Sequence, residues 1–593
     1  TGSFNLNAGT GDMLLRGSSD TRDGVLLSAS TSGNLISEGG KIDLTGSVDA
    51  GAVVSGQIQS GIRTDGAGII TINPGAGLLN MVGNGPRNGL VFGLLDNISN
   101  STTQTIIRSA NPTADAIYLK GTGGHGIGFR GASTKVYATA ALGGITIDAI
   151  SPTWSSTIYT PVEILAVSGP IRWLNSDATD GIFINNTNID LGSKAGVTGL
   201  TTSSSDITFN LKRIDGSSSF AIGTTGKVKI QGVDGTNSFS SAFNSSRFGL
   251  NANGQTMSEF TFGNQGNTSN LTIDQALTVA GPITLTGATL AINGALTASN
   301  SNLNLTASTA VTQTAAIVAN DLALQGPGNI TLTNASNNVT SISGGNLTSV
   351  GNLIFTDASG GLTVNNIRSG SSGTNGTIQI ETLQGNITLA QNLNTTSTSV
   401  NAIILNAGKN TAAGTITGGD ILVSGTPTIT MGTGGIAKLY SGSEAASTGL
   451  TTLAGGLSNI RFGADEGTTT FSPVLAAGNS YAIYRSTVPA SPTNLVATAG
   501  NAQISVAFTA GADGGGSITN YEYTINGGTT WIAANPAVTS SPLVITGLTN
   551  YTAYTVQIRA VNNAGAGTAS ASVSATPFAP ATAPSDITLS ASA

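Results

Sequence analysis

The stretch that decides the fold is Gly281-Pro282-Ile283-Thr284-Leu285, in which a turn residue precedes apolar, polar and apolar side chains. The same phrase returns as Asn302-Leu303-Asn304-Leu305 and as Gly328-Asn329-Ile330-Thr331-Leu332. Alternation over three to five residues points successive side chains to opposite faces, which indicates a half-buried strand rather than a helix. The spacings are 20 residues from Leu285 to Leu305, 19 from Leu305 to Leu324, 23 from Leu332 to Phe355 and 18 from Leu405 to Val423.

This loose period near 20 residues predicts stacked coils. A strand of a few residues is marginal alone, but a coil laid on its neighbour pairs its backbone and continues one column of Ile and Leu side chains. We therefore expect an all-β chain whose main part is an elongated parallel β-solenoid.

The composition agrees with strands and turns. Of 593 residues, 81 are Gly, only 9% are charged and 5% are aromatic, whereas soluble domains carry roughly 25% charged residues. Ion pairs therefore cannot hold the fold, and the core must be built from aliphatic side chains. An apolar content of 39% with a net charge of −7 argues against a disordered tail.

The same composition excludes much chemistry. There is no Cys and only one His, His125, so disulfides, thiolates and common zinc sites are not available. Few Lys and Arg side chains argue against nucleic acid as a partner. We predict no catalytic residue, no cofactor and no metal.

No apolar run approaches the roughly 18 residues of a membrane-spanning segment, and the first residue is Thr1. The expectation is a portion of a longer, processed chain.

We expect four regions before the C-terminal tail. Residues 1–270 carry the phrase less regularly and predict an irregular β-solenoid or β-rich region with inserted loops, or a separate globular β domain. Residues 271–455 predict regular solenoid repeats. Residues 456–488 lose the period and predict an end cap and linker, and residues 489–577 change pattern altogether.

The C-terminal pattern reads as seven short strands: 494–498, 503–508, 520–525, 530–532, 542–545, 552–562 and 569–576. Its most specific run is Gly547-Leu548-Thr549-Asn550-Tyr551-Thr552-Ala553-Tyr554, followed by Thr-Val-Gln-Ile-Arg-Ala-Val-Asn. The segment resembles a fibronectin type III domain. The resemblance implies that Tyr554 makes the tyrosine corner and that Leu548 packs below it, while Phe508 stands where the family usually has a core Trp. Pro584-Ser585-Asp586-Ile587 repeats the spacing of Pro492-Thr493-Asn494-Leu495, so residues 578–593 predict a linker and the start of a second such module.

The repeat region, through its Gly-Asn-Ile-Thr-Leu phrases and its Asn, Thr, Ser and Gly turns, resembles the filamentous haemagglutinin-like and other large β-solenoid adhesins that bacteria export. The resemblance implies a non-enzymatic fragment of a giant adhesin or filament at the bacterial cell surface, acting as a stiff stalk in attachment and in gliding motility. Its partners would be further modules of the same chain and an extracellular glycan or protein ligand. Two alternatives stay open: a carbohydrate-active β-helix enzyme with a fibronectin-type linker, and a self-assembling filament or surface-layer subunit.

The enzyme alternative depends on Asp177 and Asp180, which could serve as paired carboxylates. Asp before Gly is also a strong turn signal, and Asp20 and Asp23 repeat the pattern. Turn chemistry is therefore the preferred interpretation. Nearby, Arg172 and Trp173 could bind a sugar, although a core or cap position suits Trp173 better.

Two glycine-rich motifs also have structural interpretations. Gly9-Thr10-Gly11-Asp12-Met13-Leu14 looks like one unit of a calcium-binding repeat, but no second copy follows at that spacing. Gly124-His125-Gly126-Ile127-Gly128 lacks the strand–helix context of a nucleotide-binding loop.

Overall fold

The chain is all-β and forms two compact units, Thr1–Phe355 and Thr356–Ala593. The computed structural model describes residues 3–19, 24–29, 32–48, 60–66, 69–84, 88–92, 104–122, 125–129, 133–140, 142–150, 154–158, 162–175, 182–184, 189–194, 197, 200–212, 214–216, 220–232, 243–245, 248–251, 254–346, 348–358, 361–370 and 375–581. No helix in these ranges is long and apolar enough to cross a membrane.

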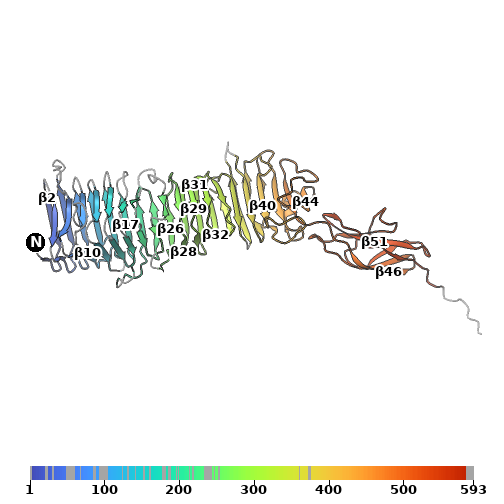
Figure 1. The fold of residues 1–593 in the computed structure, drawn as a ribbon, viewed down its shortest axis with the longest axis horizontal. Coiled ribbons are helices and arrows are strands. Elements are labelled where there is room, and N and C mark those ends of the chain that lie inside the picture. Colours follow the sequence, from blue (N-terminus) through green and yellow to red (C-terminus); the bar gives the residue numbers. More distant parts are fainter. Residues whose placement is uncertain are drawn as a thin grey trace, which may run out of the picture. The chain divides into compact units, whose positions relative to one another are not determined.

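The first part of unit 1 consists of stacked strands (Figure 1) that belong to three parallel sheets. Within each sheet, a strand pairs with the strand three places along the chain. The first sheet contains β1 (Phe4–Asn7), β4 (Ser32–Ile36), β7 (Ile69–Asn73), β10 (Gln104–Ser109), β13 (Ser133–Ala138), β16 (Val162–Ala166), β19 (Ile189–Gly192), β22 (Phe220–Ile222) and β25 (Phe248–Gly249). The second contains β2 (Met13–Ser19), β5 (Ile42–Val48), β8 (Leu79–Asn84), β11 (Ile117–Thr122), β14 (Ile145–Ile150), β17 (Ile171–Asn175), β20 (Ile207–Asn210), β23 (Lys227–Gln231) and β26 (Glu259–Phe262). The third contains β3 (Val25–Ala29), β6 (Ser60–Gly66), β9 (Asn88–Phe92), β12 (His125–Phe129), β15 (Trp154–Ile158), β18 (Ile182–Ile184) and β21 (Ile214–Gly216).

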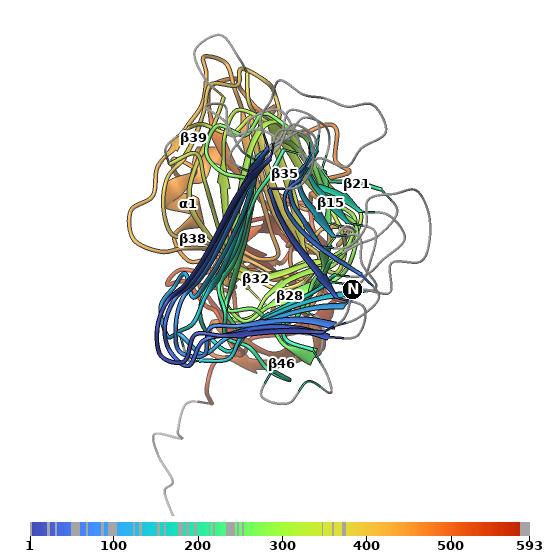
Figure 2. The same ribbon diagram turned by 90° about the vertical axis from the view of Figure 1, so that its left-hand side faces the viewer.

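These sheets form three sides of a solenoid, as the view along the coils in Figure 2 shows. Its interior is apolar, because inward side chains such as Leu44, Met81 and Leu119 are fully buried. Met13 pairs with Ile42 and Ile42 pairs with Leu79, so the coils here are much longer than 20 residues. Several aromatic side chains of this region lie inside the coils: Phe92 stacks on Phe129 with ring centroids 5.4 Å apart, and Phe220 stacks on Phe248 at 5.6 Å. Every described strand before β27 pairs in parallel with a strand of another coil.

Gly residues stack where adjacent coils turn closely. A Cβ built on Gly40 would lie 2.1 Å from the carbonyl oxygen of Gly11, and one built on Gly77 would lie 1.9 Å from that of Gly40. Only Gly leaves room for backbones at this distance. The glycine content therefore serves inter-coil approach here as well as turns.

The second part of unit 1 has shorter coils. Its strands are β24 (Phe243–Asn244), β27 (Leu271–Ile273), β28 (Leu277–Val279), β29 (Ile283–Ile292), β30 (Leu296–Ala298), β31 (Asn302–Gln313), β32 (Ile317–Gln325), β33 (Asn329–Leu332), β34 (Asn338–Gly344) and β35 (Leu353–Asp357). Strand β29 spans two of the earlier strand positions, because Ile283 pairs with Phe260 of β26 and Leu290 pairs with Leu271 of β27.

The predicted stacking is observed in this part of the chain. Leu285 pairs with Leu305 and Leu305 with Leu324, each fully or almost fully buried, and Leu332 pairs with Phe355. The polar residues between them, such as Asn304, remain partly exposed. In this part of the chain, residues one period apart in the sequence therefore do occupy equivalent positions in successive coils, as predicted.

Unit 2 begins with further parallel coils. They contain β36 (Leu362–Ser369), β37 (Ile378–Thr382), β38 (Ile387–Leu389), β39 (Leu393–Thr395), β40 (Ile403–Ala407), β41 (Ile421–Val423), β42 (Ile429–Thr430) and β43 (Ala437–Ser441). The predicted step from Leu405 to Val423 is wrong, because Leu405 pairs with Leu439 and Val423 with Leu389. An additional loop, residues 408–420, lengthens this coil, so equal spacing no longer marks equal position.

The last coil is followed by helix α1 (Leu450–Leu453), a short 3₁₀ turn (Leu457–Asn459), β44 (Ile460–Phe462) and β45 (Ser480–Tyr484). Strand β45 pairs in parallel with both β43 and β44. Residues 463–478 lie over the outer face of these strands, where Phe471 and Leu475 pack against Ile436, Tyr440 and Tyr481. This segment occupies the region predicted as an end cap.

Residues from β46 onward form an antiparallel β-sandwich. One sheet contains β46 (Thr493–Gly500), β47 (Gln503–Thr509) and β50 (Leu543–Thr546), and the other contains β48 (Asn520–Thr524), β49 (Ile532–Ala533), β51 (Tyr554–Asn562), β52 (Gly565–Ala566) and β53 (Val573–Ala575). These strands fall close to the seven predicted ranges. Residues 584–587, on which a second module was predicted, lie outside the described residues.

Candidate functional site

The three residues singled out in the C-terminal domain lie in or beside its core. The hydroxyl of Tyr554 accepts a hydrogen bond of 3.0 Å from the backbone N–H of Thr549, which is the geometry of a tyrosine corner. Leu548 and Phe508 are buried, and the Phe508 ring lies 4.6 Å from that of Tyr521. Their contacts stabilise the sandwich.

The residues of the enzyme alternative are only partly described. Asp177, Asp180, Asp20 and Asp23 lie outside the described residues. Trp173 is only 2% exposed and packs against Phe220 at 5.7 Å, so its ring is a core side chain and cannot be a sugar platform. The Arg172 guanidinium forms an exposed ion pair of 3.2 Å with Asp115.

The two glycine-rich motifs are structural where they are described. Asp12 Oδ1 accepts a 2.6 Å hydrogen bond from the backbone N–H of Lys41 in the next coil. This hydrogen bond links the turns of the two coils. His125 is the first residue of β12, and its backbone pairs with Asn88 of one neighbouring coil and Trp154 of the other. Gly124 lies outside the described residues. Among the described residues, no group of three or more His, Cys, Asp or Glu side chains is placed to hold a metal ion.

A largely buried charge cluster in unit 1 is centred on Glu163. Glu163 accepts hydrogen bonds from Lys194, at 2.8 Å, and from the Tyr137 hydroxyl. Burial pushes the pKa of Glu163 upward, but the hydrogen bonds and charge of Lys194 together with Tyr137 outweigh it and hold that pKa below its usual value. The carboxylate is therefore ionised and structural.

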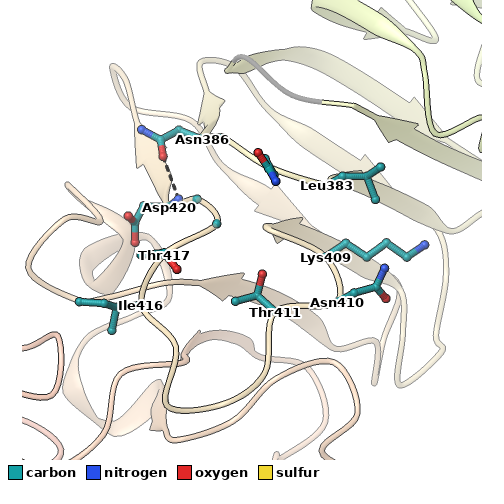
Figure 3. Close-up of a pocket in the computed structure, with 12 residues that line it drawn as sticks. Leu383, Asn386, Lys409, Asn410, Thr411, Ile416, Thr417 and Asp420 are labelled. Atoms are coloured by element: carbon teal, nitrogen blue, oxygen red, sulfur yellow. Dashed lines mark hydrogen bonds between the residues drawn. The ribbon is translucent and has the colours of Figure 1, made fainter.

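A polar pocket of about 690 Å³ lies in unit 2, between the turn after β37 and the loop of residues 408–420 (Figure 3). Figure 3 shows Lys409, Asn410 and Thr411 on one side of it and Asn386 on another, with Asn386 Oδ1 accepting a 2.9 Å hydrogen bond from the Asp420 backbone. The volume lies within the roughly 300–1,000 Å³ typical of ligand pockets.

The charges at this pocket are already satisfied. Lys409 Nζ lies 2.6 Å from Glu381 Oε2. Asp420 Oδ1 accepts hydrogen bonds from the backbone of Ser443 and from the hydroxyls of Ser441 and Ser447. The pocket therefore offers amides and hydroxyls to a neutral polar molecule.

The loop behind this pocket is held by Arg485, which is fully buried. Its Nε donates to the carbonyl of Thr415 at 3.2 Å and its Nη2 to that of Gly419 at 2.8 Å. Burial lowers the pKa of Arg485, against the opposing influence of Asp420 and Glu466. Arg485 thus fixes the 408–420 loop on the last coil.

A second cavity, of about 430 Å³, lies between the outer face of β43 and residues 469–475. Its walls are apolar side chains, two threonines and one cation: Val400, Ile436, Lys438, Thr469, Thr470, Phe471, Val474 and Leu475. We call it the cap cavity. No motif predicts this cavity. Its one signal in the sequence is the loss of the repeat between Gly456 and Arg485, where bulky residues replace the short phrases.

The comparisons with known proteins concern the C-terminal domain. Residues 490–576 match the family model described as "Fibronectin type III domain", so this part of the chain is a fibronectin type III β-sandwich. No curated protein matches the chain.

Three solved structures are similar to part of the chain. Domains A168-A170 from titin are 19% identical over 17% of this chain and 36% of that one, with a TM-score of 0.15. Titin kinase and its flanking domains are 21% identical over 15% and 17%, with a TM-score of 0.14. Chicken CNTN1 FN1-FN3 domains are 20% identical over 16% and 36%, also with a TM-score of 0.14. The matched part spans 17% to 36% of the length of these chains.

Proposed function

We propose that the protein is a non-enzymatic portion of a large exported bacterial cell-surface adhesin, in which the solenoid coils form a stiff stalk that serves surface attachment. The observation that carries the proposal is the column of in-register aliphatic residues. Leu285, Leu305 and Leu324 belong to this column and lie on successive coils. A single coil cannot bury its own core face, so each coil depends on the neighbouring coil for that burial. Bending such a column would open both buried side chains and ladder hydrogen bonds.

The chemistry of the chain supports the same role. With 22 Lys and Arg among 593 residues, the surface lacks the density of cations that a nucleic-acid partner requires. Polar side chains such as Asn304 occupy the outward positions of the repeats. A surface of this kind suits a spacer that avoids nonspecific binding.

The connection to the fibronectin type III domain is short and hydrogen-bonded. The backbone N–H of Thr487 donates to the carbonyl of Gly514 at 2.8 Å. Asn562 Nδ2 donates to the carbonyls of Thr487 and Asp513, at 3.0 and 2.8 Å. These bonds restrain residue 487 at the start of the domain, which suits a chain of modules that transmits force.

The stalk role is tested by imaging single molecules. The full chain carries a gold label at each end, and negative-stain electron microscopy gives the distribution of distances between the labels. A stiff stalk gives a narrow distribution, and L305A/L324A, which removes two stacked core side chains, broadens it. Asn304→Ala, an outward position on the same strand, is the matched control. A broad distribution for the unmodified chain would contradict the proposal.

Localisation and the alternative functions need their own measurements. Brief protease treatment of intact producing cells should remove the epitope of an antibody against residues 490–576. Release of reducing ends from a polysaccharide panel, lost in D177N/D180N, would favour the enzyme alternative. Concentration-dependent growth in light scattering would favour the self-assembling filament.

A further inference from the structure

The cap cavity has the composition of a site for an apolar molecule. Five of its lining side chains are Val400, Ile436, Phe471, Val474 and Leu475. Its volume of about 430 Å³ lies within the range of small-molecule sites, which are usually apolar with few polar groups.

The outer wall of the cavity is fixed in place without a ligand. Arg461, which is buried, donates from Nε to the carbonyl of Pro473 at 2.6 Å and from Nη2 to that of Val474 at 3.2 Å. Its guanidinium also lies over the ring of Tyr481, 5.0 Å from the centroid. A wall held by these contacts costs a ligand little ordering entropy.

The single cation of the cavity lacks a countercharge. Lys438 Nζ donates a 2.8 Å hydrogen bond to Asn401 Oδ1, and no carboxylate in the described part of the chain pairs with it. On the two adjacent strands, the residues paired with Lys438 are Ile404 and Tyr481, so Lys438 has largely apolar neighbours on either side. Burial accordingly lowers the pKa of Lys438. An ammonium group in such surroundings gains from an anion that brings its own apolar surface.

We propose that the cap cavity binds a single-chain amphipathic carboxylate, with its head group on Lys438 and its acyl chain against Phe471 and Leu475. Thr469 and Thr470 line the same cavity, and their hydroxyls are further donors for the head group. This site is independent of the stalk role, which needs no ligand here.

The proposal is tested by isothermal titration calorimetry of the full chain with sodium octanoate below its critical micelle concentration. The control ligand is 1-octanol, which has the same chain length and no charge. We expect saturable binding of one octanoate and weaker binding of octanol. Longer carboxylates should bind about 4-fold more tightly for each added CH₂ until the cavity is filled.

Three variants separate head-group from chain contacts. Lys438→Met should weaken octanoate binding about 10-fold or more and leave octanol binding unchanged. Val474→Asn should weaken both, and because Val474 is 80% exposed its replacement does not endanger folding. Lys409→Met is the control, since Lys409 is already paired with Glu381. Absence of saturable octanoate binding, equal binding of octanoate and octanol, or unaltered octanoate binding by Lys438→Met would each overturn the proposal.

Discussion

Replacing Leu305 with Ala tests whether stacked aliphatic residues hold the solenoid together. Leu305 is fully buried, and its partners in register, Leu285 and Leu324, are buried as well. Leu→Ala replacements in protein cores cost about 2–5 kcal/mol, from lost transfer energy and from the cavity left behind. The neighbours of Leu305 lie on strands fixed by ladder hydrogen bonds, so they cannot collapse into the space, and we expect about 3 kcal/mol.

Hydrogen exchange measured by mass spectrometry is the suitable assay. A chain of many coils need not unfold in two states, whereas exchange reports local opening free energy. A loss of about 3 kcal/mol corresponds to roughly 100-fold faster exchange, and it should appear in peptides from β29, β31 and β32. The control Asn304→Ala should change exchange little, because its side chain is only partly buried and makes one 3.3 Å hydrogen bond to Thr284.

Two results would refute the reasoning. If Leu305→Ala exchanged no faster than Asn304→Ala, burial in the column would not be the stabilising contact. If protection disappeared equally from the fibronectin type III domain, the effect would not be local to neighbouring coils.

Three further predictions follow from individual contacts. Tyr554→Phe removes one hydrogen bond and should lower the stability of the sandwich by about 1 kcal/mol, seen as a lower melting temperature for the domain; an unchanged value would contradict a corner role. Gly77→Ala forces a Cβ into the preceding coil and should accelerate exchange around β8, whereas Gly11→Ala, with its nearest contact at 3.4 Å, should not; equal effects would refute the steric argument. Glu163, whose pKa is lowered in the fold, contributes stability that is present above its unfolded pKa and lost as pH falls through the folded value. After correction for the intrinsic pH dependence of amide exchange, the protection factors around β16 should therefore fall in acid, and Lys194→Gln should reduce that pH dependence; an unchanged profile would argue against the pair.

Equal spacing in the sequence predicts equal position in the stacked coils only where the coils have nearly equal length. Between Leu285 and Leu324 each coil has nearly the same length, so residues equally spaced in sequence are neighbours in the column. Leu405 and Val423 have a similar spacing, but the intervening 408–420 loop places them on different ladders. Spacing alone cannot distinguish an inserted loop from a strand.

The candidate sites were less accessible to sequence reasoning than the fold. The cap cavity depends on Lys438 of β43 meeting Phe471 of a segment about 30 residues later, and neither residue belongs to a motif. The polar pocket similarly depends on Lys409 and Asn386 lying on adjacent turns. In both cases the chemistry arises from a surface that forms only when coils of unequal length are stacked.

The sequence by itself determined the alternation of apolar and polar residues, the parallel solenoid and the fibronectin type III domain, because these follow from local periodicity and from a contiguous motif around Tyr554. The tertiary structure decided the coil lengths before Leu271, the placement of Trp173 in the core and the unpaired charge of Lys438. Those features depend on which residues of different coils become neighbours, and a turn can absorb a variable number of residues without changing the strand pattern that the sequence displays.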